Sequence, residues 1–219
     1  MRRSDLNASD DAWDAALVCP GLYVGSLRAA LDVENLNIHN ITSVLTVAAK
    51  LSVCLPETIG HTTVEIIDHP AADILDVLPV ALAFIDKVIL DPIKHDQSII
   101  VHCASGISRS VSVCCAWLMT REHLTYEDSL QLIRQNRPLA MPNLGFHAQL
   151  NILSDLIKTQ ASTKDVIKLA RDTYKAKLGG QTVMDALFTQ RTYANELHSS
   201  VDGMEIFYMF SYYYTCIHI

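Results

Sequence analysis

Residues 98–110 read S-I-I-V-H-C-A-S-G-I-S-R-S, and this stretch decides the predicted fold. Ser98 to His102 is a short apolar run that is typical of a buried strand. A turn that contains Gly106 follows at once, and Ser110 to Thr120 is apolar enough for a buried helix. The stretch therefore predicts a strand, a tight loop and a helix in direct succession within a layered α/β domain.

The flanking sequence predicts the other elements of this domain. Short β-rich runs predict strands at Leu22–Val24, Ile41–Val47 and Thr62–Ile67. Apolar periodicity predicts helices at Ser26–Leu36, Leu75–Leu90, Thr125–Asn136 and after Asn143. Pro79 is expected near the first turn of its helix, where a missing N–H is tolerated. Asp73 and Asn143 are expected as helix N-caps.

The chain divides into three predicted parts. Residues 1–16 form an N-terminal tail, residues 17–160 the α/β domain, and residues 161–219 a C-terminal extension. Helical stretches are expected from Ser162 to Leu178 and from Thr182 to Leu197, before an aromatic-rich end at Ile206–Ile219. No function follows from the sequence of this extension.

Composition and charge narrow the range of partners. The formal net charge is −7 at pH 7, which argues against nucleic acid or an anionic membrane as the main partner. No apolar stretch is long enough to predict a membrane span. The 6 cysteines show no C-x-x-C pairing, so we expect a reducing location, cytoplasmic or nuclear.

Cys103 and Arg109 have the spacing of an anion-binding nucleophilic site. The loop between them can turn its backbone N–H groups toward phosphate oxygens, and Gly106 permits the tight turn that this requires. The N-terminus of the following helix and the planar guanidinium of Arg109 add positive charge. These donors favour a Cys103 thiolate, and Ser110 can donate a hydrogen bond to it. The predicted phosphate-binding residues are Ala104, Ser105, Gly106, Ile107, Ser108 and Arg109.

Such a thiolate needs a carboxylic acid to protonate the leaving oxygen. Asp68, at the end of a predicted strand, is the preferred candidate, and Asp73 is the alternative. His102 is expected to tune the thiolate through hydrogen bonds rather than to bind a metal, because the nearby histidines lack zinc spacing.

Several segments together resemble the dual-specificity branch of the protein tyrosine phosphatases. They are L-Y-V-G-S at 22–26, I-T-S-V-L-T-V at 41–47, V-E-I-I-D at 64–68, V-H-C-A-S-G-I-S-R-S at 101–110, A-W-L-M at 116–119 and N-L-G-F at 143–146. The absence of a preceding docking domain makes the small, atypical subgroup the best fit.

The resemblance implies the cysteine-phosphatase fold, with a central mixed, mostly parallel sheet flanked by helices and a helical C-terminal extension. It implies Cys103 as nucleophile, Arg109 as phosphate-binding residue and Asp68 as general acid, with His102, Ser110 and Asn143 in support. It also implies phosphorylated proteins as substrates, acted on at tyrosine, serine and threonine, and no metal or cofactor.

Two alternative functions remain open at this stage. The same loop could serve inositol lipids or RNA 5′-phosphates, although such substrates usually call for Lys within the loop and this one has none. A catalytically weak phosphoprotein-binding module would also keep the loop. The sequence predicts neither the substrate protein nor the oligomeric state.

Overall fold

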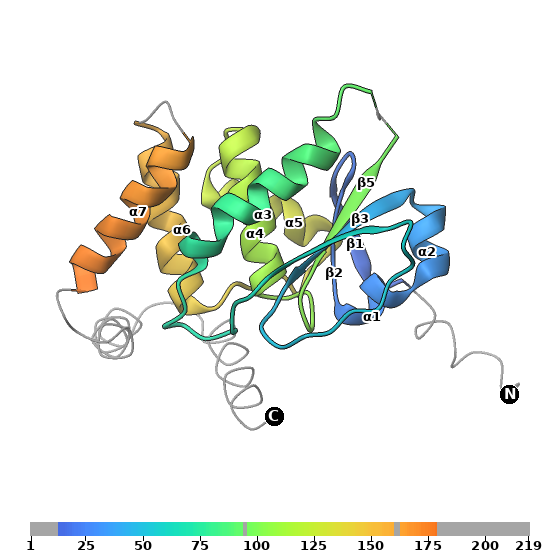
Figure 1. Cartoon of the computed structure of the whole chain (residues 1–219). Coiled ribbons are helices and arrows are strands. Elements are labelled where there is room, and N and C mark those ends of the chain that lie inside the picture. Colours follow the sequence, from blue (N-terminus) through green and yellow to red (C-terminus); the bar gives the residue numbers. More distant parts are fainter. Residues whose placement is uncertain (1–12, 94–95, 160–162, 179–219) are drawn as a thin grey trace, which may run out of the picture. The chain divides into compact units, whose positions relative to one another are not determined.

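The computed structural model describes residues 13–93, 96–159 and 163–178, which contain a five-stranded mixed sheet (Figure 1). The strands are β1 (Ala15–Cys19), β2 (Leu22–Gly25), β3 (Ile41–Val47), β4 (Gly60–Val64) and β5 (Ser98–His102). Their order in space is β1-β2-β5-β3-β4. β1 is antiparallel to β2, and the other neighbouring pairs are parallel. The predicted mixed, mostly parallel sheet is confirmed.

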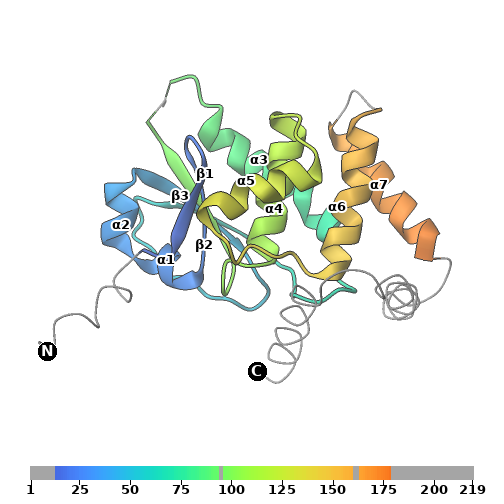
Figure 2. The same cartoon turned by 180° about the vertical axis from the view of Figure 1, so that it is seen from behind.

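Helices cover both faces of this sheet, as Figures 1 and 2 show. They are α1 (Leu27–Leu31), α2 (Val33–Ile38), α3 (Ile74–Ile89), α4 (Arg109–Arg121), α5 (Tyr126–Asn136), α6 (Leu144–Ile157) and α7 (Thr163–Leu178). The short helices α1 and α2 cover one face, and the larger group on the other face is centred on α4. Two apolar cores result, one on each side of the sheet.

The central strand β5 is buried along its whole length, and its side chains alternate between the two cores. Ile99 and Val101 pack in the larger core with α4, whereas Ile100 packs in the smaller core beneath α1 and α2. Because β5 is fixed by neighbours on both edges and both faces, its carboxyl end is a rigid base for the loop that follows.

Some predicted elements differ from the observed ones. The helix predicted at Ser26–Leu36 is two helices, because Asp32 interrupts it and caps α2 by accepting a hydrogen bond from Asn35 N. β1 was not predicted, and Pro79 lies inside α3 rather than in its first turn. β4 ends at Val64, three residues before the predicted strand end, so Asp68 lies in a loop beyond the sheet.

The predicted C-terminal boundary of the α/β domain, at residue 160, lies between α6 and α7. The first compact unit of the chain includes α7. Helix α7 packs against α3 and α6, and its Val166, Ile167 and Ala170 side chains are buried in the larger core. A second unit spans Gln181–Ile219, so the predictions for Thr182–Leu197 and Ile206–Ile219 lie outside the described residues.

Candidate active site

Cys103 lies at the point where β5 gives way to the loop, and its side chain is 1% exposed. Its Sγ accepts hydrogen bonds from the backbone N–H of Gly106 at 3.2 Å and from the Ser110 hydroxyl at 3.4 Å. Two donors directed at one buried sulfur stabilise its anionic form. The expected hydrogen bond from Ser110 is therefore present in the structure.

Gly106 has the backbone conformation that this loop requires. Its φ angle is +67°, in the left-handed region that side chains disfavour. A Cβ atom at this position would lie 2.5 Å from the backbone of Gly25 and 2.6 Å from Arg137 Nη2. Only glycine fits, because β2 passes directly behind the loop.

Arg109 opens helix α4, and its side chain turns back toward the loop that carries Asp68. Its Nη1 donates to the carbonyl of Ile66 at 3.5 Å, and its Nε lies 3.6 Å from Asp68 Oδ2. Nε is buried and has no hydrogen-bond acceptor among the described residues. The hydrogen bond from Nη1 and the ion pair with Asp68 thus hold the Arg109 guanidinium against the loop that carries Asp68.

Asp68 is fixed beside the Cys103–Arg109 loop by two side chains. Its Oδ1 accepts from the Ser108 hydroxyl at 2.7 Å and from Asn143 Nδ2 at 2.8 Å. Asn143 also caps α6, where its Oδ1 accepts from Phe146 N at 3.0 Å. The Asp68 side chain keeps 25% of its surface exposed, so solvent and substrate can reach the carboxyl group.

Asp73, the alternative acid, caps helix α3 and pairs with helix α7. Its carboxylate caps α3 by accepting from Asp76 N at 3.2 Å, and it pairs with Arg171 Nε of α7 at 2.6 Å. The structure therefore connects Asp68, and not Asp73, to the loop.

The His102 ring hydrogen-bonds to the Cys103 carbonyl and to a neighbouring strand, and not to the Cys103 sulfur. Its Nδ1 donates to the Cys103 carbonyl at 3.1 Å. Burial lowers the pKa of His102 to about 4, so the ring is neutral at pH 7 and its Nε2 accepts a hydrogen bond. The donor is the Thr46 hydroxyl, 2.8 Å away.

A chain of hydrogen bonds continues from Thr46 across the sheet. The Thr46 hydroxyl uses its one hydrogen in the bond to His102, so its oxygen accepts a hydrogen bond from His61 Nε2 at 2.8 Å. Three neighbouring strands, β4, β3 and β5, thus support the Cys103 carbonyl. Sequence reasoning missed Thr46 and His61, because strand register, which the sequence does not show, brings them together.

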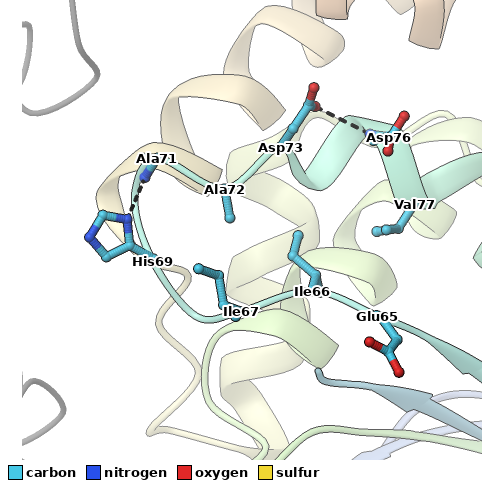
Figure 3. Close-up of a pocket in the computed structure, with 9 residues that line it drawn as sticks. All are labelled: Glu65, Ile66, Ile67, His69, Ala71, Ala72, Asp73, Asp76 and Val77. Atoms are coloured by element: carbon cyan, nitrogen blue, oxygen red, sulfur yellow. Dashed lines mark hydrogen bonds between the residues drawn. The ribbon is translucent and has the colours of Figure 1, made fainter. Parts of the chain in front are cut away.

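A cavity of about 330 Å³ lies beside the Asp68 loop (Figure 3). It is lined by Glu65, Ile66, Ile67, His69, Ala71, Ala72, Asp73, Asp76 and Val77. None of the residues from Cys103 to Arg109 lines it, so this cavity does not include the loop that carries Cys103. Among the described residues, no cluster of His, Cys, Asp and Glu could hold a metal ion.

A buried thiol that accepts hydrogen bonds from a backbone N–H and a hydroxyl, with an arginine and a carboxylate at the same loop, defines a cysteine-dependent phosphatase site. Comparison with known proteins agrees with this class. The family model of the dual specificity phosphatase catalytic domain matches residues 22–155. The chain therefore belongs to the dual specificity phosphatase family, and it is a cysteine-dependent protein phosphatase of that family.

Individual relatives cover most of the described chain. Dual specificity protein phosphatase 1B of Arabidopsis thaliana is 32% identical over 148 residues, which are 68% of this chain and 86% of the plant protein. Dual specificity protein phosphatase 22 of Homo sapiens is 30% identical over 169 residues, which are 77% of this chain and 84% of the human protein.

Solved structures share the same fold. Human DUSP28 superposes with a TM-score of 0.62 at 28% identity, over 67% of this chain and 96% of that one. A mouse dual specificity phosphatase complexed with zinc tungstate gives a TM-score of 0.64 at 32% identity, over 71% of this chain and 96% of that one. The predicted cysteine-phosphatase fold is confirmed.

Proposed function

We propose that Cys103 attacks the phosphorus atom of phosphotyrosine, phosphoserine and phosphothreonine side chains in proteins. A P–S bond forms while the P–O bond to the substrate side chain breaks, and Asp68 gives its proton to the departing oxygen. Asp68, now a carboxylate, removes a proton from water, and the water oxygen attacks the phosphocysteine. The P–S bond breaks, inorganic phosphate leaves, and the Ser110 hydroxyl stabilises the returning thiolate.

One observation carries this proposal: the Asp68 carboxylate is bonded to Ser108 of the loop whose Cys103 sulfur accepts two hydrogen bonds. The acid is thereby hydrogen-bonded to the same loop that carries the nucleophile, although the two residues are 35 positions apart in the chain (103 − 68). Asn143 holds the same carboxylate from the start of α6. A preorganised pair of this kind is what two-step phosphoryl transfer requires.

Phosphate binding falls to the loop backbone and to Arg109. The N–H groups of residues 104–109 and the N-terminus of α4 supply donors for an anion, and the buried Arg109 Nε is available to a phosphate oxygen. Ala104, Ser105, Ile107 and Ser108 carry no charge, which favours a single phosphate on a protein over polyphosphorylated inositol lipids.

Phosphorylated proteins are the proposed partners, and a cytoplasmic or nuclear location is the proposed setting. The described cysteines, Cys19, Cys54, Cys103, Cys114 and Cys115, are all free thiols. A reducing compartment preserves a reactive thiolate. Within the described ranges, no helix has the length and apolarity needed to cross a bilayer.

Phosphate release from matched substrates tests the proposal. The purified full chain is incubated with phosphotyrosine, phosphoserine and phosphothreonine peptides, a soluble inositol polyphosphate and a 5′-phosphorylated oligoribonucleotide. The proposal expects release from the peptides and none from Cys103→Ser. Faster release from the inositol or RNA substrate would favour that alternative, and tight peptide binding without turnover would indicate a binding module.

A further inference from the structure

The outward face of the phosphate-binding loop is held by a set of hydrogen-bond donors from elsewhere in the fold. The Ala104 carbonyl accepts from Leu27 N at 3.1 Å, and the Ile107 carbonyl accepts from Met141 N at 2.8 Å. Between them, the carbonyls of Ser105 and Gly106 both accept from one side chain, Arg137. Four successive carbonyls are therefore bonded to donors outside the loop.

Arg137 ends helix α5, 31 residues after Gly106, and is 9% exposed. Its Nε donates to the Gly106 carbonyl at 2.6 Å, and its Nη2 donates to the Ser105 carbonyl at 2.9 Å. A planar guanidinium offers two donors in a fixed fork that fits adjacent carbonyls, and the ammonium group of lysine lacks this fixed geometry.

These two bonds determine where the N–H groups of the loop point. A trans peptide unit directs its C=O and N–H to opposite sides. The Ser105 carbonyl shares its peptide unit with the Gly106 N–H, which donates to Cys103 Sγ at 3.2 Å. The Gly106 carbonyl likewise shares its unit with the Ile107 N–H. Arg137 thus turns two loop N–H groups inward, and one of them reaches the nucleophile.

Asp14 keeps the positive charge of Arg137 on the outer side of the loop. Its Oδ1 lies 3.1 Å from Nη2, and its carbonyl accepts from Nη1 at 3.3 Å. A paired and buried guanidinium stays in place, and it does not compete with the loop for the substrate phosphate. Adjacent to it, Asn136 Nδ2 donates to the Leu17 carbonyl of β1 at 2.9 Å, which fixes the end of α5 against this strand.

We propose that Arg137 is a positioning residue of the active site: its guanidinium holds the Ser105 and Gly106 peptide units so that their N–H groups face the Cys103 sulfur and the substrate phosphate. The proposal rests on the proposed function, because it assigns Arg137 the task of shaping the loop in which that chemistry occurs. Arg137 acts through the backbone and does not touch the substrate.

The test compares Arg137→Met and Arg137→Lys with Arg134→Met. Arg134 lies one turn earlier on α5, and its Nε also donates to a backbone carbonyl, that of Ala140 at 2.9 Å, but this carbonyl is outside the loop. The probe is tungstate, a tetrahedral oxyanion, whose dissociation constant is measured by titration calorimetry. The pH midpoint of Cys103 alkylation by iodoacetate and the free energy of unfolding in urea are measured alongside.

Arg137→Met should weaken tungstate binding by about 10- to 100-fold, because the loop loses the charge-assisted hydrogen bonds that orient two of its N–H groups. It should also move the alkylation midpoint to higher pH. The tungstate affinity of Arg137→Lys should lie between those of Arg137→Met and wild type. Arg134→Met should bind tungstate like wild type. If Arg137→Met does not fold, Arg137→Lys alone decides.

Tungstate binding within about twofold of wild type in the folded Arg137 variants would overturn the proposal. Equal weakening by Arg134→Met would overturn it as well, since a general loss of stability would then explain both. Failure of the proposed function has a different signature: Cys103→Ser would hydrolyse substrate like wild type, whatever the Arg137 variants do to tungstate binding.

Discussion

The Ser108 hydroxyl donates a hydrogen bond to Asp68 Oδ1 across 2.7 Å, so the proposed acid is attached to the loop that is proposed to bind phosphate. Ser108 also accepts from Asn143 N at 3.1 Å. A single side chain therefore connects the β4–α3 loop, the Cys103–Arg109 loop and the start of α6. Any movement of the loop would therefore displace the Asp68 carboxylate.

Asp68→Asn should slow the release of alkyl and phenyl leaving groups by about 10²- to 10⁴-fold, because an amide cannot deliver the proton. p-Nitrophenyl phosphate, whose leaving group needs little proton assistance, should be affected less. Steady-state kcat for these substrates measures the difference. Ser108→Ala should cause a smaller loss that nearly disappears in the Asp68→Asn background.

Asp73→Asn is the matched control for this prediction. Asparagine still caps a helix, so α3 should remain intact, and only the pairing with Arg171 and Lys175 should weaken. Its kcat should stay close to that of wild type for every leaving group. A leaving-group dependence in Asp73→Asn, with none in Asp68→Asn, would transfer the acid role to Asp73.

Because His102 is buried, the folded chain should lose stability in mild acid. Its pKa is about 4 in the folded chain because burial opposes its charged form, against 6.5 as the unperturbed value. The unfolded chain therefore binds the proton first, and stability present above pH 6.5 is lost as the pH falls toward 4. The difference corresponds to about 3 kcal/mol.

Urea unfolding at a series of pH values checks this prediction. His102→Gln removes the titrating group, so its unfolding free energy should fall less between neutral pH and about pH 4 than that of wild type. The lowered pKa values of His61 and His147, both caused mainly by burial, act in the same direction and remain in both proteins. Parallel curves for the two proteins would contradict the assignment.

Gly106→Ala should reduce kcat/KM by about 100-fold or more, because the new methyl group displaces loop donors that stabilise the transition state. The methyl group would overlap with the backbone of Gly25 at 2.5 Å. Gly21→Ala is the control: it shares a positive φ angle, but its nearest neighbour lies at 3.4 Å. It should cost about 1–2 kcal/mol of stability and leave activity unchanged. Similar kinetics in both variants would argue against a special role for Gly106.

Helix α7 should contribute to the stability of the catalytic unit. Ile167→Ala, at a side chain that is 3% exposed, should lower the free energy of unfolding by about 2–5 kcal/mol. Leu169→Ala, on the same helix but 39% exposed, should cost about 1 kcal/mol or less. Thermal and urea unfolding measure both. Equal effects would mean that α7 does not pack as the structure shows.

The loop motif and its context were predictable from the sequence because the constraints there are local. Cys103, Gly106 and Arg109 lie within seven successive residues, and the apolar strand before them and the apolar helix after them fix the geometry. The cap residues Asp73 and Asn143 were predictable for the same reason, since each accepts a hydrogen bond from a backbone N–H three residues further on.

The support of the loop was not predictable, because it comes from distant parts of the chain. In the sequence, Arg137 is one more charged residue at the end of a predicted helix. Its hydrogen bonds to the Ser105 and Gly106 carbonyls appear only in the folded structure. Thr46 and His61 meet through strand pairing, which has no local signal. The burial of α7 likewise depends on tertiary contacts with α3 and α6, and its sequence shows only that it is helical.

Covalent trapping tests the central claim most directly. The full chain is mixed with a phosphotyrosine peptide for a single turnover, quenched and digested, and the peptide that carries the phosphoryl group is sequenced by mass spectrometry. The account predicts a phosphocysteine at Cys103, with more of it in Asp68→Asn for a good leaving group, because water attack then lacks its base. A phosphoryl group on another residue, or turnover by Cys103→Ser at the wild-type rate, would contradict it.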